Sequence, residues 1–205
     1  MISAARRLAT LRMRVLTTFL RRVVILVREL DDERNDFPLR SDLALVVVEY
    51  AQAAEYLALR PDQDRALLEA RFARGDRCFA VRAGDRLVHA TWASTGSGPL
   101  PYLDADVRLA PHDVCFYDSY TAPGWRGHDV SRSRDELCRR SFRAAGMRRT
   151  VALIARENVG GLRTTVPLRY RAIGEYGLLR VGPLRRRWTT PYGAEPLPSL
   201  VPRPR

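Results

Sequence analysis

The chain has 205 residues, of which 46% are hydrophobic, so it is long enough to bury a substantial core as one domain. Its formal net charge is +12, and all 35 basic residues are arginine. The three cysteines and three histidines are scattered, which excludes a disulfide framework and a clustered Cys/His metal site and favours a reducing, cytoplasmic compartment.

The charge is distributed unevenly along the chain. Residues 1–28 carry +7, residues 29–122 carry −7 and residues 123–205 carry +12. A basic second half can attract the phosphates of a nucleotide, an RNA or a membrane surface. A solvated face rich in arginine would give the same totals.

The first 20 residues are predicted to form a basic helix that packs on the domain and leads into a strand at 22–30. Arginines interrupt the apolar stretch from Leu8 to Val27, so no segment can span a bilayer. No signal-peptide cleavage site follows a clean apolar stretch. A basic amphipathic helix lying on a membrane surface is the alternative.

Between residues 31 and 112 the pattern predicts an acidic loop, a buried strand, two helices and a hairpin turning at 83–85. Their ranges are 31–39, 42–50, 51–60, 62–75 and 77–94. A loop is expected at 95–101, followed by a short strand or an irregular stretch at 102–112.

The second half alternates strands and helices. A strand at 113–123 is expected to place Val114, Phe116, Asp118 and Tyr120 on one face. A helix at 130–145, a strand at 149–157, a short helix at 158–166 and a strand at 170–182 follow, and the Pro- and Arg-rich tail 183–205 is expected to be loose. The order predicts an α/β domain with one central mixed sheet flanked by helices.

Three segments of this half resemble the GCN5-related N-acetyltransferases, the GNAT superfamily. They are "FYDSYTAPGWRGHDV", "RTVALIARENVGGL" and "PLRYRAIGEYGLLRVG", and the resemblance covers roughly residues 76–182. It implies a single GNAT-like domain at 21–182 in which a loop at a helix start binds the pyrophosphate of acetyl-CoA. A strand that splays from its neighbour would admit the pantetheine arm, and the reaction would form an amide on a small-molecule amine.

The resemblance also assigns the donor-binding residues. Carried over by position, they are Tyr120, Thr121, Arg126, Gly127, His128, Asp129, Val130, Ser131 and Asn158. The sequence departs from the family where Asp129 replaces a glycine, because its carboxylate would repel a pyrophosphate unless it turned aside or capped its own helix. Thr165 also stands where many members place the tyrosine that protonates the leaving thiolate.

The donor therefore has two candidates. Acyl-CoA is the family's usual cofactor. Aminoacyl-tRNA as the donor would need no cofactor, and its many phosphates could each bind one of the arginines of this half. Phosphate contacts with RNA are assigned to Arg132, Arg139, Arg140 and Arg143, which are predicted to share one helix face. A non-catalytic RNA-binding module with the same fold is the alternative to an enzyme.

Three residues are candidates for acceptor chemistry. His89 could act as a base or orient the amine, although a lone histidine in a strand also fits a hydrogen-bonded core position. Asp118 is costly to bury in an apolar strand without a partner, so it either binds the amine or pairs with an arginine. Tyr117 could donate a proton to the leaving group or simply fill the core.

Overall fold

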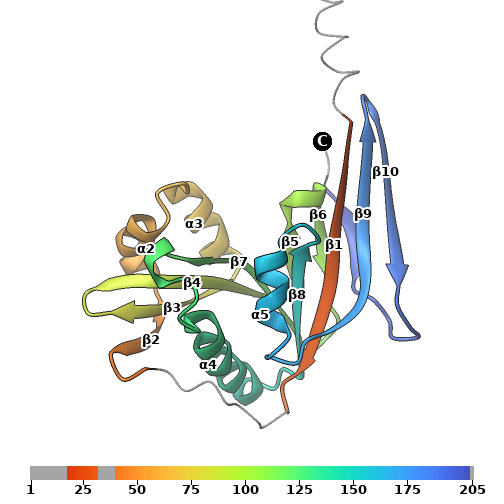
Figure 1. The fold of residues 1–205 in the computed structure, drawn as a ribbon. Helices are drawn as coiled ribbons and strands as arrows, with labels where there is room; N and C mark the ends of the chain where they lie inside the picture. The colour runs from red at the N-terminus through yellow and green to blue at the C-terminus, as the bar shows by residue number, and fades with distance from the viewer. Residues whose placement is uncertain (1–17, 32–39, 204–205) are drawn as a thin grey trace, which may run out of the picture.

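The computed structural model describes residues 18–31 and 40–203. Its centre is an eight-stranded sheet in the order β10-β9-β1-β8-β7-β4-β3-β2 (Figure 1). β7 and β8 run parallel and all other neighbours are antiparallel, so the sheet is mixed as expected. The strands are β1 (Thr18–Glu29), β2 (Leu43–Val48), β3 (Arg77–Ala83), β4 (Arg86–Thr95), β7 (Asp113–Thr121), β8 (Arg149–Ala155), β9 (Arg171–Val181) and β10 (Leu184–Pro191).

Helices cover both faces of this sheet. They are α2 (Ala53–Leu59), α3 (Arg65–Ala73), α4 (Val130–Ala144) and α5 (Val159–Thr165), with short 3₁₀ turns η1 (Tyr50–Gln52), η2 (Pro101–Leu103) and η3 (Pro123–Trp125). Phe142 of α4 packs against Phe79 of β3, whereas Tyr56 of α2 packs with Cys78 of the same strand. Because neighbouring strand residues point to opposite faces, α4 lies on one face and α2 with α3 on the other.

A second, three-stranded sheet covers the rest of the α2/α3 face. It consists of β5 (Ser97–Leu100), β6 (Ala105–Arg108) and β11 (Ser199–Pro202), in the order β11-β6-β5. Val107 of β6 and Leu103 of the adjoining turn η2 share a core with Val23 and Ile25 of β1. One face of the large sheet therefore carries helices on one half and a small sheet on the other.

The structure corrects the expected loop at 95–101 and the expected loose tail. Residues 97–100 form a strand instead of a loop, and residues 105–108 form its partner. The tail is not loose, because β10 pairs with β9 and β11 pairs with β6. The predicted N-terminal helix lies outside the described residues except at 18–20, which belong to β1.

Candidate active site

The parallel strands β7 and β8 separate halfway along their length. Their pairing runs only from Asp113 and Arg149 to Phe116 and Ala152. Beyond Phe116, β7 continues to Thr121 beside β4, while β8 continues beside β1. The centre of the sheet therefore opens into a wedge.

A β-bulge in β7 lies at the point of this wedge. Tyr117 pairs with Trp92 and Tyr120 with Ala90, so Asp118 and Ser119 together oppose the single residue Thr91. Asp118 has a φ of 48°, in the left-handed region that aspartate tolerates better than most residues. The extra residue breaks the expected alternation, and Tyr117, Asp118 and Tyr120 all lie on the α2/α3 side.

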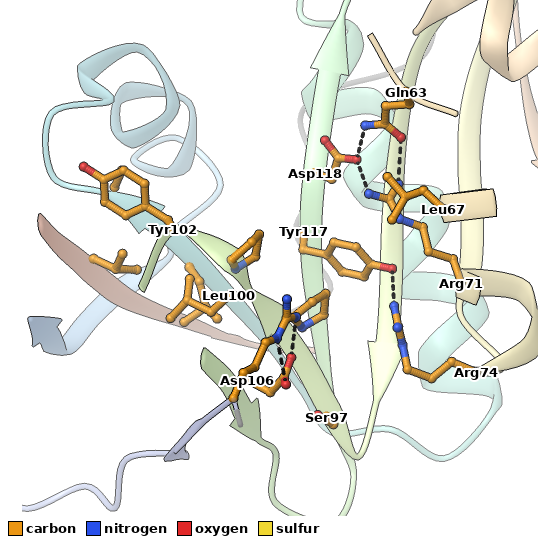
Figure 2. A pocket seen from close by; sticks show the side chains of 16 residues that line it. Gln63, Leu67, Arg71, Arg74, Ser97, Leu100, Tyr102, Asp106, Tyr117 and Asp118 are labelled. Atoms are coloured by element: carbon orange, nitrogen blue, oxygen red, sulfur yellow. Dashed lines mark hydrogen bonds and ion pairs between the residues drawn. The ribbon is translucent and has the colours of Figure 1, made fainter. Parts of the chain in front are cut away.

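A pocket of about 870 Å³ opens on the wedge, between α3 and the second sheet. Its volume lies within the range of small-molecule sites, about 300–1,000 Å³. The large sheet contributes Val23, Tyr117, Asp118, Leu153 and Ala155; the α3 region contributes Gln63, Leu67, Arg71 and Arg74; and the other wall contains Ser97, Pro99, Leu100, Pro101, Tyr102, Asp106 and Arg203. In Figure 2, Asp118 and Tyr117 lie on the side of Gln63, Arg71 and Arg74, and Leu100 and Tyr102 lie on the other side.

Three donors hold the carboxylate of Asp118. Arg60 Nη1 and Gln63 Nε2 donate to its two oxygens at 2.7 Å each. Arg71 Nη2 forms an ion pair with Oδ2 at 2.7 Å. The Asp118 side chain remains 21% exposed and lines the pocket. Because an ionised carboxylate offers about four acceptor positions, the described contacts leave one for a ligand.

Tyr117 is also held in place by charged neighbours. Its hydroxyl donates to Asp76 Oδ2 at 2.5 Å and accepts from Arg74 Nη2 at 3.3 Å. Burial first, and then the bond to Asp76, raise the pKa of Tyr117 far above its usual value near 10. Tyr117 is therefore a protonated phenol whose proton is held by Asp76, and its predicted role as a proton donor to the leaving group finds no support, because its raised pKa makes it a weaker acid.

The loop between β7 and α4 turns sharply at two left-handed residues. Gly127 has a φ of 81°, and no atom lies within 4 Å of where its Cβ would be. Asp129 has a φ of 55° at the N-cap position, yet its side chain makes no capping hydrogen bond. The carboxylate instead pairs with Arg132. Of the two alternatives for Asp129, the side chain turns aside and does not cap the first amides of α4.

The other predicted donor-binding residues of this loop differ in their contacts and in their exposure. Arg126 Nε donates to the carbonyl of Thr121 at 3.2 Å, and the ring of exposed His128 lies 6.3 Å from that of Trp125. Val130 is buried and anchors the start of α4 in the core. Ser131, in the first turn, is partly exposed.

His89 lies on the wrong side of the sheet for pocket chemistry. It is 1% exposed, with Nδ1 2.8 Å from Thr121 Oγ1, and its Nε2 accepts from Arg134 Nε of α4 at 3.3 Å. Burial, and then the Arg134 charge, lower the pKa of His89 well below 6.5. It is a neutral core histidine, and its predicted role as a base for the amine finds no support.

Two further expectations do not fit the structure. Asn158 is the N-cap of α5, where its side chain accepts from the Gly161 amide, so it is occupied as a structural cap. Arg139 is 4% exposed and donates to the Leu30 carbonyl, so it cannot reach an RNA phosphate. Arg140 and Arg143 are exposed.

Sequence reasoning missed the residues that surround Asp118. Arg71 follows the fully buried Leu68 by three positions, hence on the same face of α3. An arginine on the buried face of a helix requires a partner, and that signal could have led to Asp118. No comparable signal exists for Asp106 and Arg203, which meet only through the pairing of β6 with β11.

The described residues contain neither a membrane-spanning helix nor a cluster of metal-binding side chains. Within residues 18–31 and 40–203, no helix combines the length and apolar character needed to cross a membrane. In the same ranges, no group of three or more histidine, cysteine, aspartate or glutamate residues could hold a metal ion.

Comparison with known proteins identifies the fold. No protein-family model and no curated protein matches the sequence. Among solved structures, AAC(6′)-Iy in complex with the bisubstrate analogue CoA-S-monomethyl-acetylneamine matches at 14% identity and a TM-score of 0.53, over 64% of this chain and 92% of that chain. A protein from Novosphingobium aromaticivorans DSM 12444, described as an acetyltransferase from the GNAT family, matches at 15% identity and a TM-score of 0.52, over 80% and 65%.

A conserved protein of unknown function from Staphylococcus epidermidis ATCC 12228 matches at 11% identity and a TM-score of 0.53. The match covers 85% of this chain and 67% of that chain. At such low identities these matches establish the fold alone. The chain therefore has the α/β fold of the GNAT acetyltransferases, which confirms at the level of the fold the resemblance seen in its sequence.

Proposed function

We propose that the protein is an N-acyltransferase that forms an amide between the acyl group of an acyl-CoA and a small-molecule amine. The observation that carries this proposal is the separation of β7 from β8 directly in front of a pocket. A thioester entering between the strands would reach an amine held in the pocket beside Asp118. The three cysteines are buried and free, in keeping with a reducing compartment such as the cytoplasm.

The loop after β7 fits the phosphates of such a donor. Space is open at Gly127, and the Asp129 carboxylate is paired with Arg132 instead of covering the helix start. Amides at a helix N-terminus and the helix dipole both favour an anion. The loop lies about 10 Å beyond Asp118, three residues further along β7. The donor would supply the activated acyl carbon, and this chain would bind and orient it.

The pocket suits the acceptor nitrogen in its neutral form. Asp118 can accept one N–H, while the guanidiniums of Arg60 and Arg71 on the same carboxylate disfavour an additional positive charge. A neutral amine is the nucleophile that the reaction needs. As the C–N bond forms and the C–S bond breaks, the amine loses a proton and the sulfur leaves as a thiolate. The thiolate takes up that proton, so the products are an amide and a thiol.

The tRNA-dependent alternative receives less support from the described residues. Of the four arginines assigned to RNA phosphates, Arg139 is buried and Arg132 is paired with Asp129. The counterion release that favours RNA binding depends on accessible cations. The same loss weakens the case for a non-catalytic RNA-binding module.

Calorimetric titration with acetyl-CoA tests the donor assignment. Wild-type protein should bind acetyl-CoA, and Gly127→Glu should abolish binding because it places a carboxylate among the phosphates. Gly124→Glu is the control for added charge, since Gly124 also has open space around it and lies in η3, ahead of the left-handed turn at Gly127 and Asp129. Equal affinities in the two variants would remove the loop from the donor site. Binding of charged tRNA that falls steeply with salt, without acetyl-CoA binding, would transfer the donor role to RNA.

A further inference from the structure

The two walls of the pocket differ in chemistry. The wall formed by β7 and the α3 region carries Gln63, Arg71, Arg74, Tyr117 and Asp118. The facing wall contains apolar groups, among them Pro99, Leu100, Pro101 and the ring of Tyr102, and Leu100 and Tyr102 lie across from Tyr117 in Figure 2. A ligand that fills the cavity therefore meets polar groups at one side and apolar groups at the other.

Every charged residue that lines the pocket already has an oppositely charged partner. Arg71 pairs with Asp118, and Arg74 pairs with the buried Asp76. On the far rim, Arg203 forms two hydrogen bonds with Asp106, at 2.6 and 3.0 Å. Among the described lining residues there are three guanidiniums and two carboxylates. No carboxylate in this set is left to balance several ammonium groups.

From these two features, and resting on the proposed acyl transfer, we propose that the acceptor is a monoamine with an apolar alkyl or aralkyl body, and that the pocket rejects polyamines and aminoglycosides. The nitrogen lies at the one open acceptor position of Asp118. The body of the molecule lies against Leu67, Leu100, Tyr102 and Leu153. A second ammonium group would enter beside guanidiniums without a carboxylate to receive it.

This proposal separates the protein from its structural neighbour. The analogue bound to AAC(6′)-Iy joins CoA to acetylneamine, so that protein accommodates a molecule derived from an amine-rich sugar. A polycation needs carboxylates that are available to it, whereas the described carboxylates here are held by arginines of the same chain. The shared fold would thus carry a different acceptor specificity.

A matched pair of amines gives the sharpest test. Hexylamine and hexamethylenediamine have the same length and differ by one amino group. Hexylamine should have a kcat/KM at least about tenfold higher with acetyl-CoA, because like charges placed together cost binding energy. Within a series of linear monoamines, kcat/KM should rise roughly threefold per methylene until the apolar wall is covered. Calorimetric binding of both amines to the protein, with and without CoA, provides a readout independent of turnover.

A carboxylate added to the pocket should change the preference for hexylamine over hexamethylenediamine. Leu67 is 40% exposed in the first turn of α3, where an acid is compatible with the helix, so Leu67→Asp adds a third carboxylate to the pocket lining. It should reduce the preference for hexylamine severalfold and raise use of the diamine. Leu184→Asp, on β10 and 72% exposed, adds the same charge away from the pocket and should leave the preference unchanged.

The outcomes distinguish this proposal from the acyl transfer on which it rests. Equal or better use of hexamethylenediamine or neamine by wild-type protein would overturn the monoamine specificity and leave acyl transfer standing. Acetyl-CoA binding without any binding of hexylamine would also overturn it. Failure to bind acetyl-CoA would count against the acyl transfer, while direct amine titrations would still decide what the pocket accepts.

Discussion

The charge of Asp118 should hold α3 to β7 as well as serve the pocket. Asp118→Asn removes this charge and keeps the backbone, because asparagine also adopts the left-handed conformation found at this position. Arg60 would keep its second partner, Asp62, at 2.8 Å. Arg71, whose side chain is 8% exposed, would lose its only ion pair among those described. The loss therefore falls mainly on one buried guanidinium.

The magnitude follows from that single contact. A hydrogen bond to a charged group contributes about 1.5–3 kcal/mol, and the partial exposure of Asp118 places the expected loss in unfolding free energy near 2 kcal/mol. Urea denaturation at neutral pH measures it. Asp62→Asn is the control, because the Asp62 side chain is 62% exposed and an exposed ion pair contributes little to stability. Should Asp118→Asn destabilise no more than Asp62→Asn, the pairing would not be what secures α3. In the folded variant, kcat/KM for an amine should fall at least about tenfold.

Three other perturbations have definite expected results. Gly177→Ala should lower the unfolding free energy by about 1–3 kcal/mol, because the added Cβ would lie 2.1 Å from the indole of Trp188; an unchanged denaturation midpoint would contradict this. His89 is held neutral, because its pKa in the folded protein lies below 6.5. The stability that this provides above pH 6.5 should therefore be lost as the pH falls toward the folded pKa. In His89→Gln, the unfolding free energy from urea titrations should depend less on pH between about pH 5 and 7. Removal of residues 199–205 should raise the KM for the amine about tenfold and leave acetyl-CoA affinity intact, since β11 pairs with β6 behind the apolar wall. Loss of both would show that β11 supports the whole domain.

Local sequence patterns were sufficient for much of the fold. The helix at 130–145 and the hairpin at 77–94 have strong periodicity and turn signals, and both are present as α4 and as β3 with β4. The second sheet could not be predicted in this way. Its strands have four residues each, and β11 lies about ninety positions from its partner β6. Such pairing depends on contacts that no local window contains.

Local sequence patterns also predicted part of the candidate site. Asp118 and Tyr117 could be chosen because an acid and a phenol in an apolar strand need an explanation, and both line the pocket. His89 could not be judged, because strand periodicity does not say which face carries the pocket. The bulge hid the true alternation, so Tyr120 was predicted on the wrong face. Whether these residues serve acyl transfer stays a prediction.

The bulge in β7 also bears on how such a site can be gained or lost. Because Asp118 is the extra residue, Ser119 and Thr121 face α4 and Tyr120 faces α2 just as they would in a regular strand without it. An insertion of one residue can therefore add an acid to the sheet without turning any other side chain around. Deleting Asp118 would restore an unbroken ladder with β4 and leave the scaffold without its carboxylate. Gain or loss of one codon could therefore add or remove the acid while the fold is kept.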